Sequence, residues 1–503
     1  MYISTRGGAA PVTASRAIYL GMAPDGGLYV PEHIPRFGAD EIAAMAELTY
    51  PELATAILGR FLCDYDDGEI REAVGAAYGA NFNSEDIAPL AFLEGFCGVM
   101  ELFHGPTAAF KDMALQLTPR LLSQAMAKAG AGQNMLILVA TSGDTGKAAL
   151  EGFKDVPGIS VACFFPDQGV SKAQELQMRS TDGKNTFVYG VKGNFDDCQN
   201  GVKAIFNDLD FNRELAGMGW QLSSANSINW GRLCPQIVYY FHGYLSLVRS
   251  RRVGMGRPAH FVVPTGNFGN ILSAWYAREM GLPIGKLICA SNDNRVLTDF
   301  FETGLYDRER EFYKTSSPSM DILISSNLER FLFEMNGHDS AAIKGYMGSL
   351  AARGSFAGDE GLIRRIGALL WAGSATQKEA ADEIRRVFEE HHYLMDTHTA
   401  VGAAVYGKYR EATGDDTFAI LDATASPYKF SKSVYEALGG AMSGDEGDED
   451  ELAIAGRLAG LTGTDVHPAL EGLDRRPILH PGTINREDIK AAVKAIASGA
   501  AGL

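Results

Sequence analysis

The feature that most constrains the fold is a regular alternation of short apolar runs with segments of helical spacing. The apolar runs are NMLILVA (134–140), ISVACFFP (159–166), TFVYGV (186–191), HFVVP (260–264), KLICAS (286–291) and FAILDATAS (418–426). Each run precedes a segment whose apolar residues recur at the spacing of a helix. Strands that alternate with helices in this way form a parallel sheet covered by helices, so the sequence predicts an α/β fold.

Glycine-rich turns follow two of these predicted strands, at TSGDTG (141–146) and PTGNFGN (264–270). In parallel α/β folds, ligands bind at the carboxyl ends of strands, where such turns lie. Glycine lets the backbone approach a ligand closely, and the N–H groups that begin the next helix favour an anion. Both turns are candidate phosphate loops, and a plain strand-to-helix turn is the alternative at each.

The first of these loops does not match a nucleotide-binding P-loop. A Walker A motif needs a glycine five positions before its Gly-Lys pair and Ser or Thr directly after the lysine. Relative to Gly146-Lys147, this chain has Thr141 and Ala148 at those positions. The mismatch argues against an ATPase, which would bind ATP through Lys147 and carry no chromophore.

The stretch FHGPTAAFKDMALQL (103–117) places Lys111 between a Gly-Pro-Thr turn and an apolar run. Because lysine is seldom fully buried without a partner, Lys111 either extends its amine into water at a helix start or has a chemical role. Pyridoxal phosphate needs a lysine amine for its aldehyde carbon and backbone amides for its phosphate. We therefore expect Lys111 to form a Schiff base with this cofactor.

Charge and composition exclude several classes of partner. The net charge of −17 argues against nucleic acid and against an anionic membrane, but not against a small anionic substrate. No apolar run is long enough for a spanning helix, and the N-terminus lacks the apolar core of a signal peptide. The six cysteines are scattered, which is typical of a reducing compartment, so we expect a soluble cytoplasmic protein.

Two polar regions, the histidine-containing stretch 391–400 and the acidic run 443–451, have no catalytic interpretation. HHY (391–393) and HTA (398–400) offer no third ligand at a suitable spacing, so no metal site is expected. Asp396-Thr397-His398-Thr399 instead predicts a capped helix start. SGDEGDEDE (443–451) carries six acidic residues in nine and predicts a solvated loop or a short disordered insert.

Five motifs occur in the order and approximate spacing of the threonine synthase family. They are HGPTAAFKDMA (104–114), ATSGDTGKAAL (140–150), SANSINWGRL (224–233), VVPTGNFGN (262–270) and DATASPYKF (422–430). PDGGLYVP (24–31) also resembles the N-terminal domain of that family. The resemblance covers roughly residues 1–435, and five co-linear motifs are far more specific than any one of them.

The resemblance implies a fold type II pyridoxal-phosphate enzyme, similar to the tryptophan synthase β subunit. Such an enzyme has two parallel-sheet α/β domains and an N-terminal domain, and we expect a monomer or homodimer. The implied domains are 1–95 (N-terminal), 136–254 (small), 96–135 with 255–440 (large, cofactor-binding) and 441–503 (acidic run and C-terminal extension). The large domain would contain a helical insert at about 300–395, with GLIRRIGALLWAG (361–373) as one helical stretch.

The resemblance also implies roles for single residues. Lys111 matches the catalytic lysine that binds the cofactor, and Thr424 matches the residue that hydrogen-bonds the pyridine nitrogen. The loop that holds the cofactor phosphate is matched by Gly266, Asn267, Phe268, Gly269 and Asn270. The implied substrate contacts are Thr107, Ser142, Asp144, Thr145, Asn226, Ser227, Asn229 and Arg232. In one departure, Ser426 stands where family members often have histidine.

The reaction implied by the resemblance is the last step of threonine biosynthesis, from O-phospho-L-homoserine to L-threonine. Lys111 would act as a base at Cα, phosphate would leave from Cγ by β,γ-elimination, and water would add at Cβ. The alternatives are another fold type II lyase such as a serine or threonine dehydratase, a homologue with another product, and a non-catalytic scaffold. The hydroxyl-rich loop together with Arg232 favours a phosphorylated substrate.

Overall fold

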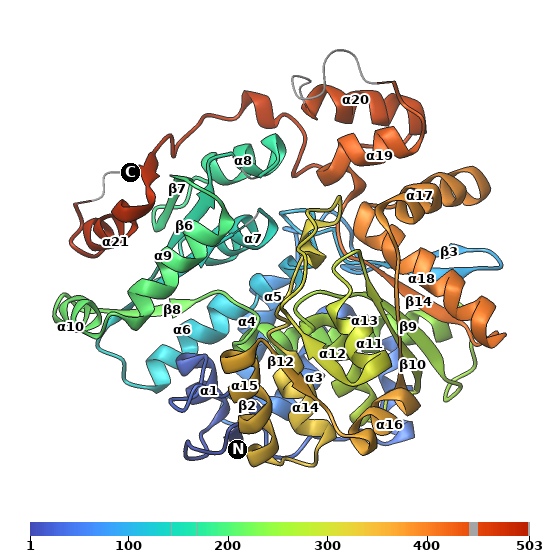
Figure 1. Cartoon of the computed structure of the whole chain (residues 1–503), viewed down its shortest axis with the longest axis horizontal. Coiled ribbons are helices and arrows are strands. Elements are labelled where there is room, and N and C mark those ends of the chain that lie inside the picture. The colour runs from blue at the N-terminus through green and yellow to red at the C-terminus, as the bar shows by residue number, and fades with distance from the viewer. Residues whose placement is uncertain (142, 169, 442–450, 501–503) are drawn as a thin grey trace.

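The computed structural model describes residues 1–141, 143–168, 170–441 and 451–500, and helices pack around a larger and a smaller sheet (Figure 1). The larger sheet has the strand order β13-β10-β9-β14-β4-β3, and only β3 runs antiparallel to its neighbour. Its strands are β3 (Leu90–Leu93), β4 (Cys97–Glu101), β9 (Ala259–Pro264), β10 (Ile284–Ser291), β13 (Leu370–Ser374) and β14 (Ala419–Ala423). The predicted α/β class is confirmed.

The smaller sheet has the order β15-β7-β6-β5-β8, and these strands are all parallel. They are β5 (Asn134–Ala140), β6 (Ile159–Pro166), β7 (Thr186–Lys192), β8 (Trp220–Ser224) and β15 (Thr483–Asn485). The helices that follow these strands or precede them are α6 (Thr118–Lys128), α7 (Asp144–Phe153), α8 (Lys172–Arg179), α9 (Phe195–Asn207) and α10 (Leu209–Gly217).

The N-terminal segment packs against α6 and against the buried helix Trp230–Arg249. It contains β1 (Tyr2–Ser4), α1 (Ala14–Leu20), β2 (Tyr29–Pro31), α2 (Ala39–Ala44), α3 (Tyr50–Phe61) and α4 (Asp67–Ala77). β1 and β2 form an antiparallel pair. The later helices are α12 (Gly269–Glu279), α13 (Val296–Thr303), α14 (Leu328–Met335), α15 (Ser340–Arg353), α16 (Glu360–Leu369), α17 (Gln377–His391), α18 (Thr397–Thr413) and α19 (Ser431–Ala437), with the short strands β11 (Leu305–Asp307) and β12 (Ser355–Ala357).

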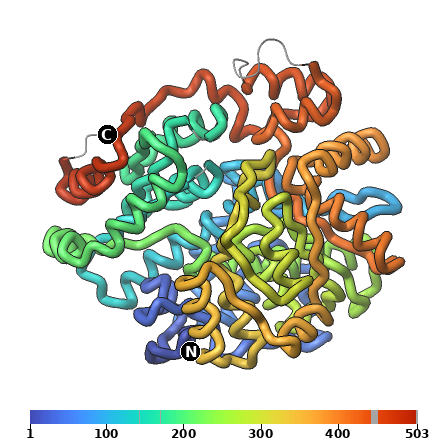
Figure 2. The backbone as a smooth tube through the Cα atoms, viewed as in Figure 1, coloured from blue at the N-terminus to red at the C-terminus, as the bar shows by residue number. Residues whose placement is uncertain are grey.

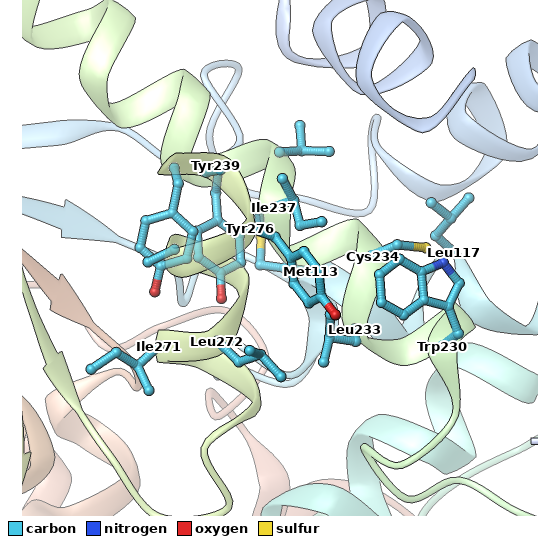
Figure 3. Packing of buried hydrophobic residues seen from close by; sticks show 14 of the residues in the cluster. Met113, Leu117, Trp230, Leu233, Cys234, Ile237, Tyr239, Ile271, Leu272 and Tyr276 are labelled. Carbon is cyan, nitrogen blue, oxygen red and sulfur yellow. The ribbon is translucent and has the colours of Figure 1, made fainter. Parts of the chain in front are cut away.

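The helix α11 (Trp230–Arg249) is buried along most of its length. Figure 3 shows its side chains packing with residues from the region of α5 (Asp112–Leu115) and from α12: Trp230, Leu233, Cys234, Ile237 and Tyr239 with Met113, Leu117, Ile271, Leu272 and Tyr276. A helix that is apolar on all sides is typical of a protein core. α11 therefore joins the helix that follows Lys111 to the helix that follows the second glycine-rich turn.

The C-terminal segment connects the larger unit, which is the larger sheet with its helices, to the smaller unit, which is the smaller sheet with its helices (Figure 2). α20 (Glu451–Thr462) packs on α19, and the chain then runs along the outer side of the smaller unit to β15 and α21 (Ile489–Ala497) (Figure 2). Arg179 Nη1 donates to the carbonyl oxygens of His480 at 2.9 Å and Gly482 at 3.2 Å. The tail is therefore hydrogen-bonded into the fold. Of the predicted acidic loop 443–451, only Glu451 is among the described residues, and it begins α20.

Most of the predicted strands correspond to strands of the structure. The predictions for 134–140 and 159–166 are confirmed as β5 and β6, and the others overlap β7, β9, β10 and β14. Asp396 caps α18 through the N–H groups of His398 and Thr399, as predicted. The helical prediction for 361–373 is wrong at its end, because α16 stops at Leu369 and β13 pairs with β10. Strand pairing outweighs helical spacing there.

The described ranges contain neither a membrane-spanning helix nor a cluster of metal-binding side chains. No helix there combines the length and the apolar character that crossing a lipid bilayer requires. The same residues bring no three histidine, cysteine, aspartate or glutamate side chains together as a candidate metal site. The six cysteines are unpaired thiols.

A buried polar network joins α11, α12 and β14 close to the end of β14. Tyr240 Oη lies within hydrogen-bond distance of Asp422 Oδ2, at 2.8 Å, and of Asn270 Oδ1, at 2.7 Å, and Asn270 Nδ2 donates to Asp422 Oδ2 at 3.1 Å. Asp422 Oδ1 has no partner among the described residues. Burial raises the pKa of Asp422 to about 7, although its two hydrogen bonds act in the opposite direction.

The raised pKa of Asp422 predicts a pH-dependent stability. Below about pH 4 the carboxyl is neutral in the folded and the unfolded chain, and its stabilising contribution is complete. Between about pH 4 and pH 7 the carboxyl is ionised in the unfolded chain but still protonated in the folded core, so this contribution is lost progressively, on the order of 4 kcal/mol by the pH at which the folded carboxyl ionises. Asp422→Asn should therefore lose less free energy of unfolding than the wild type between pH 5.5 and 8.5 in urea titrations. Asp210→Asn, at a side chain that is 89% exposed, is the control; parallel losses in Asp422→Asn and wild type would contradict the prediction.

Gly152 predicts a second effect on stability. A Cβ at this position would lie 1.9 Å from the carbonyl oxygen of Leu115, because α7 and α5 touch there. Gly152→Ala should destabilise the protein by about 2 kcal/mol or more, since overpacking outweighs the better helix propensity of alanine. Gly75→Ala in α4, where a Cβ meets no atom within 4 Å, should raise stability by up to about 1 kcal/mol. Thermal unfolding should therefore show a lower Tm than wild type for Gly152→Ala and a higher Tm for Gly75→Ala.

Candidate active site

The turn before Lys111 is held by backbone hydrogen bonds to the segment that follows β14. The Phe110 N–H donates to the Thr424 carbonyl at 2.8 Å, and the Ser426 N–H donates to the Ala108 carbonyl at 3.0 Å. Ala109 and Ala425 form an antiparallel bridge between them. The hydrogen bonds therefore bring Lys111 and Thr424 together, although more than three hundred residues separate them in the sequence.

Within the described ranges, the Lys111 amine takes part in no ion pair. Among the described residues no hydrogen bond or salt bridge involves its Nζ, which lies 4.6 Å from the centroid of the Phe110 ring. The side chain is partly exposed to the site but surrounded closely enough that burial lowers its pKa to about 8. The Asp144 carboxylate opposes this shift, and the cations Arg232 and Lys429 add to it. A neutral, reactive amine is therefore accessible near neutral pH.

Asp144 is the first residue of α7, and its carboxylate is held from several sides. Lys429 Nζ lies 2.7 Å from Oδ1, Gln174 Nε2 donates to Oδ1 at 2.9 Å, and Ser319 Oγ donates to Oδ2 at 3.3 Å. Burial alone would raise the pKa of Asp144, but the cations of Lys429 and Lys111 hold it well below its usual range. In this arrangement the predicted substrate contact Asp144 is bound by other side chains of the protein.

Three other predicted substrate contacts, Thr107, Ser142 and Thr145, lie on the turn before Lys111 or on the first glycine-rich loop, and the described ones differ in burial. Thr107 is fully buried, and its Oγ1 donates to Asp112 Oδ1 at 2.8 Å while its N–H donates to Asp112 Oδ2 at 2.8 Å. Thr107 therefore shapes the turn that carries Lys111. Burial raises the pKa of Asp112 to about 7 against these hydrogen bonds. Thr145 is partly exposed beside Asp144, and Ser142 lies outside the described residues.

The second glycine-rich turn begins α12 and is packed closely against the segment 319–327. A Cβ on Gly266 would lie 2.7 Å from the Ser319 carbonyl oxygen. Phe268 has a left-handed φ of 63° and packs on the rings of Phe301 and Phe331.

Asn267, in the same turn, is exposed, and its carbonyl accepts from the Asn327 N–H at 3.0 Å. The first N–H groups of α12, from Gly269 and Asn270, have no acceptor within the helix.

Asn270 and Thr424 contribute differently to the site. The Asn270 side chain belongs to the core network with Tyr240 and Asp422, so only its backbone N–H is available to a ligand. The Thr424 hydroxyl has no hydrogen-bond partner among the described residues. Ser426, at the position where the family often has histidine, accepts from the Tyr428 N–H at 3.4 Å and caps a short 3₁₀ helix, η3 (Pro427–Phe430).

The side chains predicted to lie near the substrate's phosphate differ in exposure and in their hydrogen bonds; they are Asn226, Ser227, Asn229 and Arg232. Asn226 is exposed, and Ser227 Oγ accepts from Asn327 Nδ2 at 3.1 Å. Asn229 caps α11 through the Gly231 N–H at 2.8 Å and donates to the Ile18 carbonyl at 2.9 Å, so its side chain is fully engaged.

Arg232 is the buried member of this group. It is 5% exposed and donates through Nη1 to the Ala225 carbonyl, and its Nε has no partner in the described part of the chain. Burial lowers its pKa to about 10. No carboxylate among the described residues forms a salt bridge with it. Because an unpaired buried charge is costly, this guanidinium favours an anionic ligand.

Several residues of the site were missed by the sequence analysis. Lys429 stands within the motif DATASPYKF, so a buried charge in an apolar motif was a usable signal. Gln174, Ser319 and Asn327 carry no such local signal. Arg330 is fully buried and binds Asn327 Oδ1 at 2.6 Å and the Tyr29 carbonyl at 2.9 Å, linking the second loop to the N-terminal segment. Only the folded chain brings these residues to the site.

The arrangement fits the cofactor that the sequence predicts. The unpaired Lys111 amine suits an aldehyde, and the free N–H groups at the start of α12 suit a phosphate. The free Thr424 hydroxyl suits a ring nitrogen.

Comparisons with known proteins give the family. Residues 1–78 match the family described as Threonine synthase N terminus, residues 94–421 match Pyridoxal-phosphate dependent enzyme, and residues 399–466 match Threonine synthase, C-terminal. Threonine synthase from Methylobacillus glycogenes is 41% identical over 451 residues, which cover 87% of this chain and 92% of the relative.

A solved structure and a human relative agree with this match. The pyridoxal-phosphate-bound threonine synthase of Brucella melitensis superposes with a TM-score of 0.88 at 38% identity, covering 100% of this chain and 99% of that chain. Human Threonine synthase-like 1 is 42% identical over 434 residues, or 84% of this chain, and the chain spans 58% of its length. The chain therefore belongs to the threonine synthase family of fold type II enzymes, whose cofactor is pyridoxal phosphate.

Proposed function

We propose that this chain converts O-phospho-L-homoserine and water to L-threonine and phosphate. One observation carries the proposal: the charge of Arg232 acts on the Lys111 amine. Among the described residues, Lys111 has no ion pair, and the buried Arg232 has no carboxylate partner. An amine of this kind suits proton transfer, and a buried guanidinium suits a phosphate. Relatives named threonine synthase support the same reaction.

In this proposal, Lys111 holds the cofactor through its ε-amine, and the N–H groups of the Gly266–Asn270 loop hold its phosphate. Thr424 would hydrogen-bond the pyridine nitrogen. A hydroxyl at that position is neutral, so it does not force a proton onto the ring. Bound pyridoxal phosphate would supply an electron sink that makes the hydrogen on the substrate's Cα acidic.

Lys111 is the proton carrier. When its amine is free and neutral, Lys111 would take the Cα proton, and it would move protons at Cβ later in the reaction. Its lowered pKa of about 8 leaves a useful neutral fraction at neutral pH. Arg232 would bind the substrate's phosphate and stabilise the negative charge that grows on it as the bond to Cγ breaks.

The contacts between the two sheets support exclusion of water during the elimination. Ser319 and Lys429, on the larger unit, both bind Asp144 at the start of α7 on the smaller unit. These contacts cross the site beside Lys111. A closed cleft would keep the reactive intermediate from bulk water until one water adds at Cβ.

The direct test measures phosphate and L-threonine released from O-phospho-L-homoserine in the presence of pyridoxal phosphate. Equal yields of both products are expected. Phosphate together with a keto acid would favour the dehydratase-like alternative, and no phosphate from a protein that binds the cofactor would contradict the substrate. A place in threonine biosynthesis, a cytoplasmic location and a monomeric or homodimeric state stay predictions.

Lys111→Ala should abolish turnover and covalent cofactor binding while leaving the fold intact. The reason is that no other described residue places an unpaired amine beside Thr424. Absorbance of bound pyridoxal phosphate and a phosphate-release assay measure the two losses. Lys378→Ala, at a side chain 83% exposed, is the matched control and should behave as wild type. Turnover of Lys111→Ala at the wild-type rate would overturn the role of Lys111.

Arg232→Met should lower kcat/KM by about 100-fold, on the order of 3 kcal/mol, through loss of a buried charge that binds phosphate. Inhibition by inorganic phosphate should weaken in parallel. Stability should change little, because an unpaired buried cation is replaced by an apolar side chain of similar length. Arg213→Met, at a side chain 79% exposed, is the control. Unchanged phosphate inhibition in Arg232→Met would contradict the assignment.

A further inference from the structure

The site contains an ion pair to which the proposed reaction assigns no proton transfer. Lys429 Nζ lies 2.7 Å from Asp144 Oδ1, and the two side chains are 1% and 5% exposed. Lys429 belongs to η3, directly after β14 of the larger sheet, whereas Asp144 begins α7 beside the smaller sheet. Lys429 Nζ also donates to the Thr107 carbonyl at 3.0 Å, in the turn that carries Lys111.

The Asp144 carboxylate binds Lys429 directly, and its charge also acts on Lys111. Asp144 Oδ1 is taken by Lys429 and by Gln174, and its Oδ2 accepts from Ser319. The Lys111 amine forms no salt bridge in the described ranges, although the charge of Asp144 acts on it. Because a buried carboxylate strongly favours a paired cation, the pair with Lys429 leaves Lys111 free.

The other charges around Lys111 do not replace Lys429 in this arrangement. Arg232 on α11 is a cation that disfavours a second positive charge nearby. Asp112 on α5 is bound by Thr107. On the neighbouring helices, Lys147 of α7 pairs with Glu151 at 2.8 Å, and Arg120 of α6 donates to the Gln116 carbonyl at 2.8 Å. Lys429 is thus the side chain whose charge neutralises Asp144 directly.

We propose that Lys429 is a positioning residue that binds Asp144 and thereby keeps the Lys111 amine unpaired and reactive. The inference rests on the role of Lys111 in the proposed function. Without the Lys429 charge, the buried Asp144 carboxylate would draw the proton-bearing form of Lys111 as its counter-ion. The fraction of neutral Lys111 amine at neutral pH would then fall.

The test measures the reactivity of the Lys111 amine directly, without substrate. The full-length chain is stripped of pyridoxal phosphate and labelled with a trace of acetic anhydride from pH 6 to 10, and mass spectrometry reads the extent of labelling at Lys111. Only the neutral amine reacts, so the pH profile gives its protonation equilibrium. The exposed Lys378 is the internal reference.

In Lys429→Met the labelling profile of Lys111 should move up by about one pH unit, which is about tenfold slower labelling at pH 7. Lys429→Arg restores the charge and should return the profile to near that of wild type. The double variant Asp144→Asn/Lys429→Met removes both charges and should also lie near wild type. A folded Lys429→Met with the wild-type profile would overturn the proposal.

A second comparison keeps the proposal testable if Lys429→Met does not fold. Lys429→Gln removes the charge but keeps a donor for the Thr107 carbonyl, and its Lys111 labelling profile should also move up by about one pH unit. A folded Lys429→Gln with the wild-type profile would overturn the proposal. Since labelling needs no substrate, a failure to form threonine would contradict the proposed function and leave this result unaffected.

Discussion

The site depends on the backbone pairing between the turn before Lys111 and the segment after β14. Two hydrogen bonds, from Phe110 to Thr424 and from Ser426 to Ala108, fix this turn against the end of a central strand. Backbone hydrogen bonds of this kind do not depend on side-chain identity, and they set positions to within a fraction of an ångström. Lys111, Thr424 and Lys429 therefore share one rigid support, to which the smaller unit contributes Asp144.

The electrostatics of the site are opposite in sign to those of the whole protein. The chain carries a net charge of −17, yet the described residues around the lysine include the cations Lys111, Lys429 and Arg232 with Asp144 as the strongly ionised carboxylate. A surplus of buried positive charge is unstable without an anion. Burial lowers the pKa of Lys111, and the neighbouring cations Arg232 and Lys429 add to this shift. The same cations favour a phosphorylated ligand, so they contribute to both binding and reactivity.

The second glycine-rich turn is supported from outside the sheet that carries it. Arg330 is fully buried and connects Asn327, which binds the turn, to the Tyr29 carbonyl of the N-terminal segment. Burial lowers the pKa of Arg330 to about 10, which reflects how completely it is removed from water. The N-terminal segment thus reaches the site through one buried cation, although it contributes no predicted ligand.

The sequence by itself determined the features that arise from local order. Apolar runs followed by helical spacing identified β5 and β6, and glycine-rich turns identified both loops, because period and backbone freedom are properties of neighbouring residues. Only the tertiary structure decided which polar side chains are engaged: Asn229 caps a helix and Thr107 binds Asp112, whereas Arg232 stays without a carboxylate partner within the described ranges. It also decided that Lys429 meets Asp144 and that residues 483–485 join the smaller sheet. These contacts join residues that are far apart in the chain, and their energies depend on burial and pairing, which no local pattern contains.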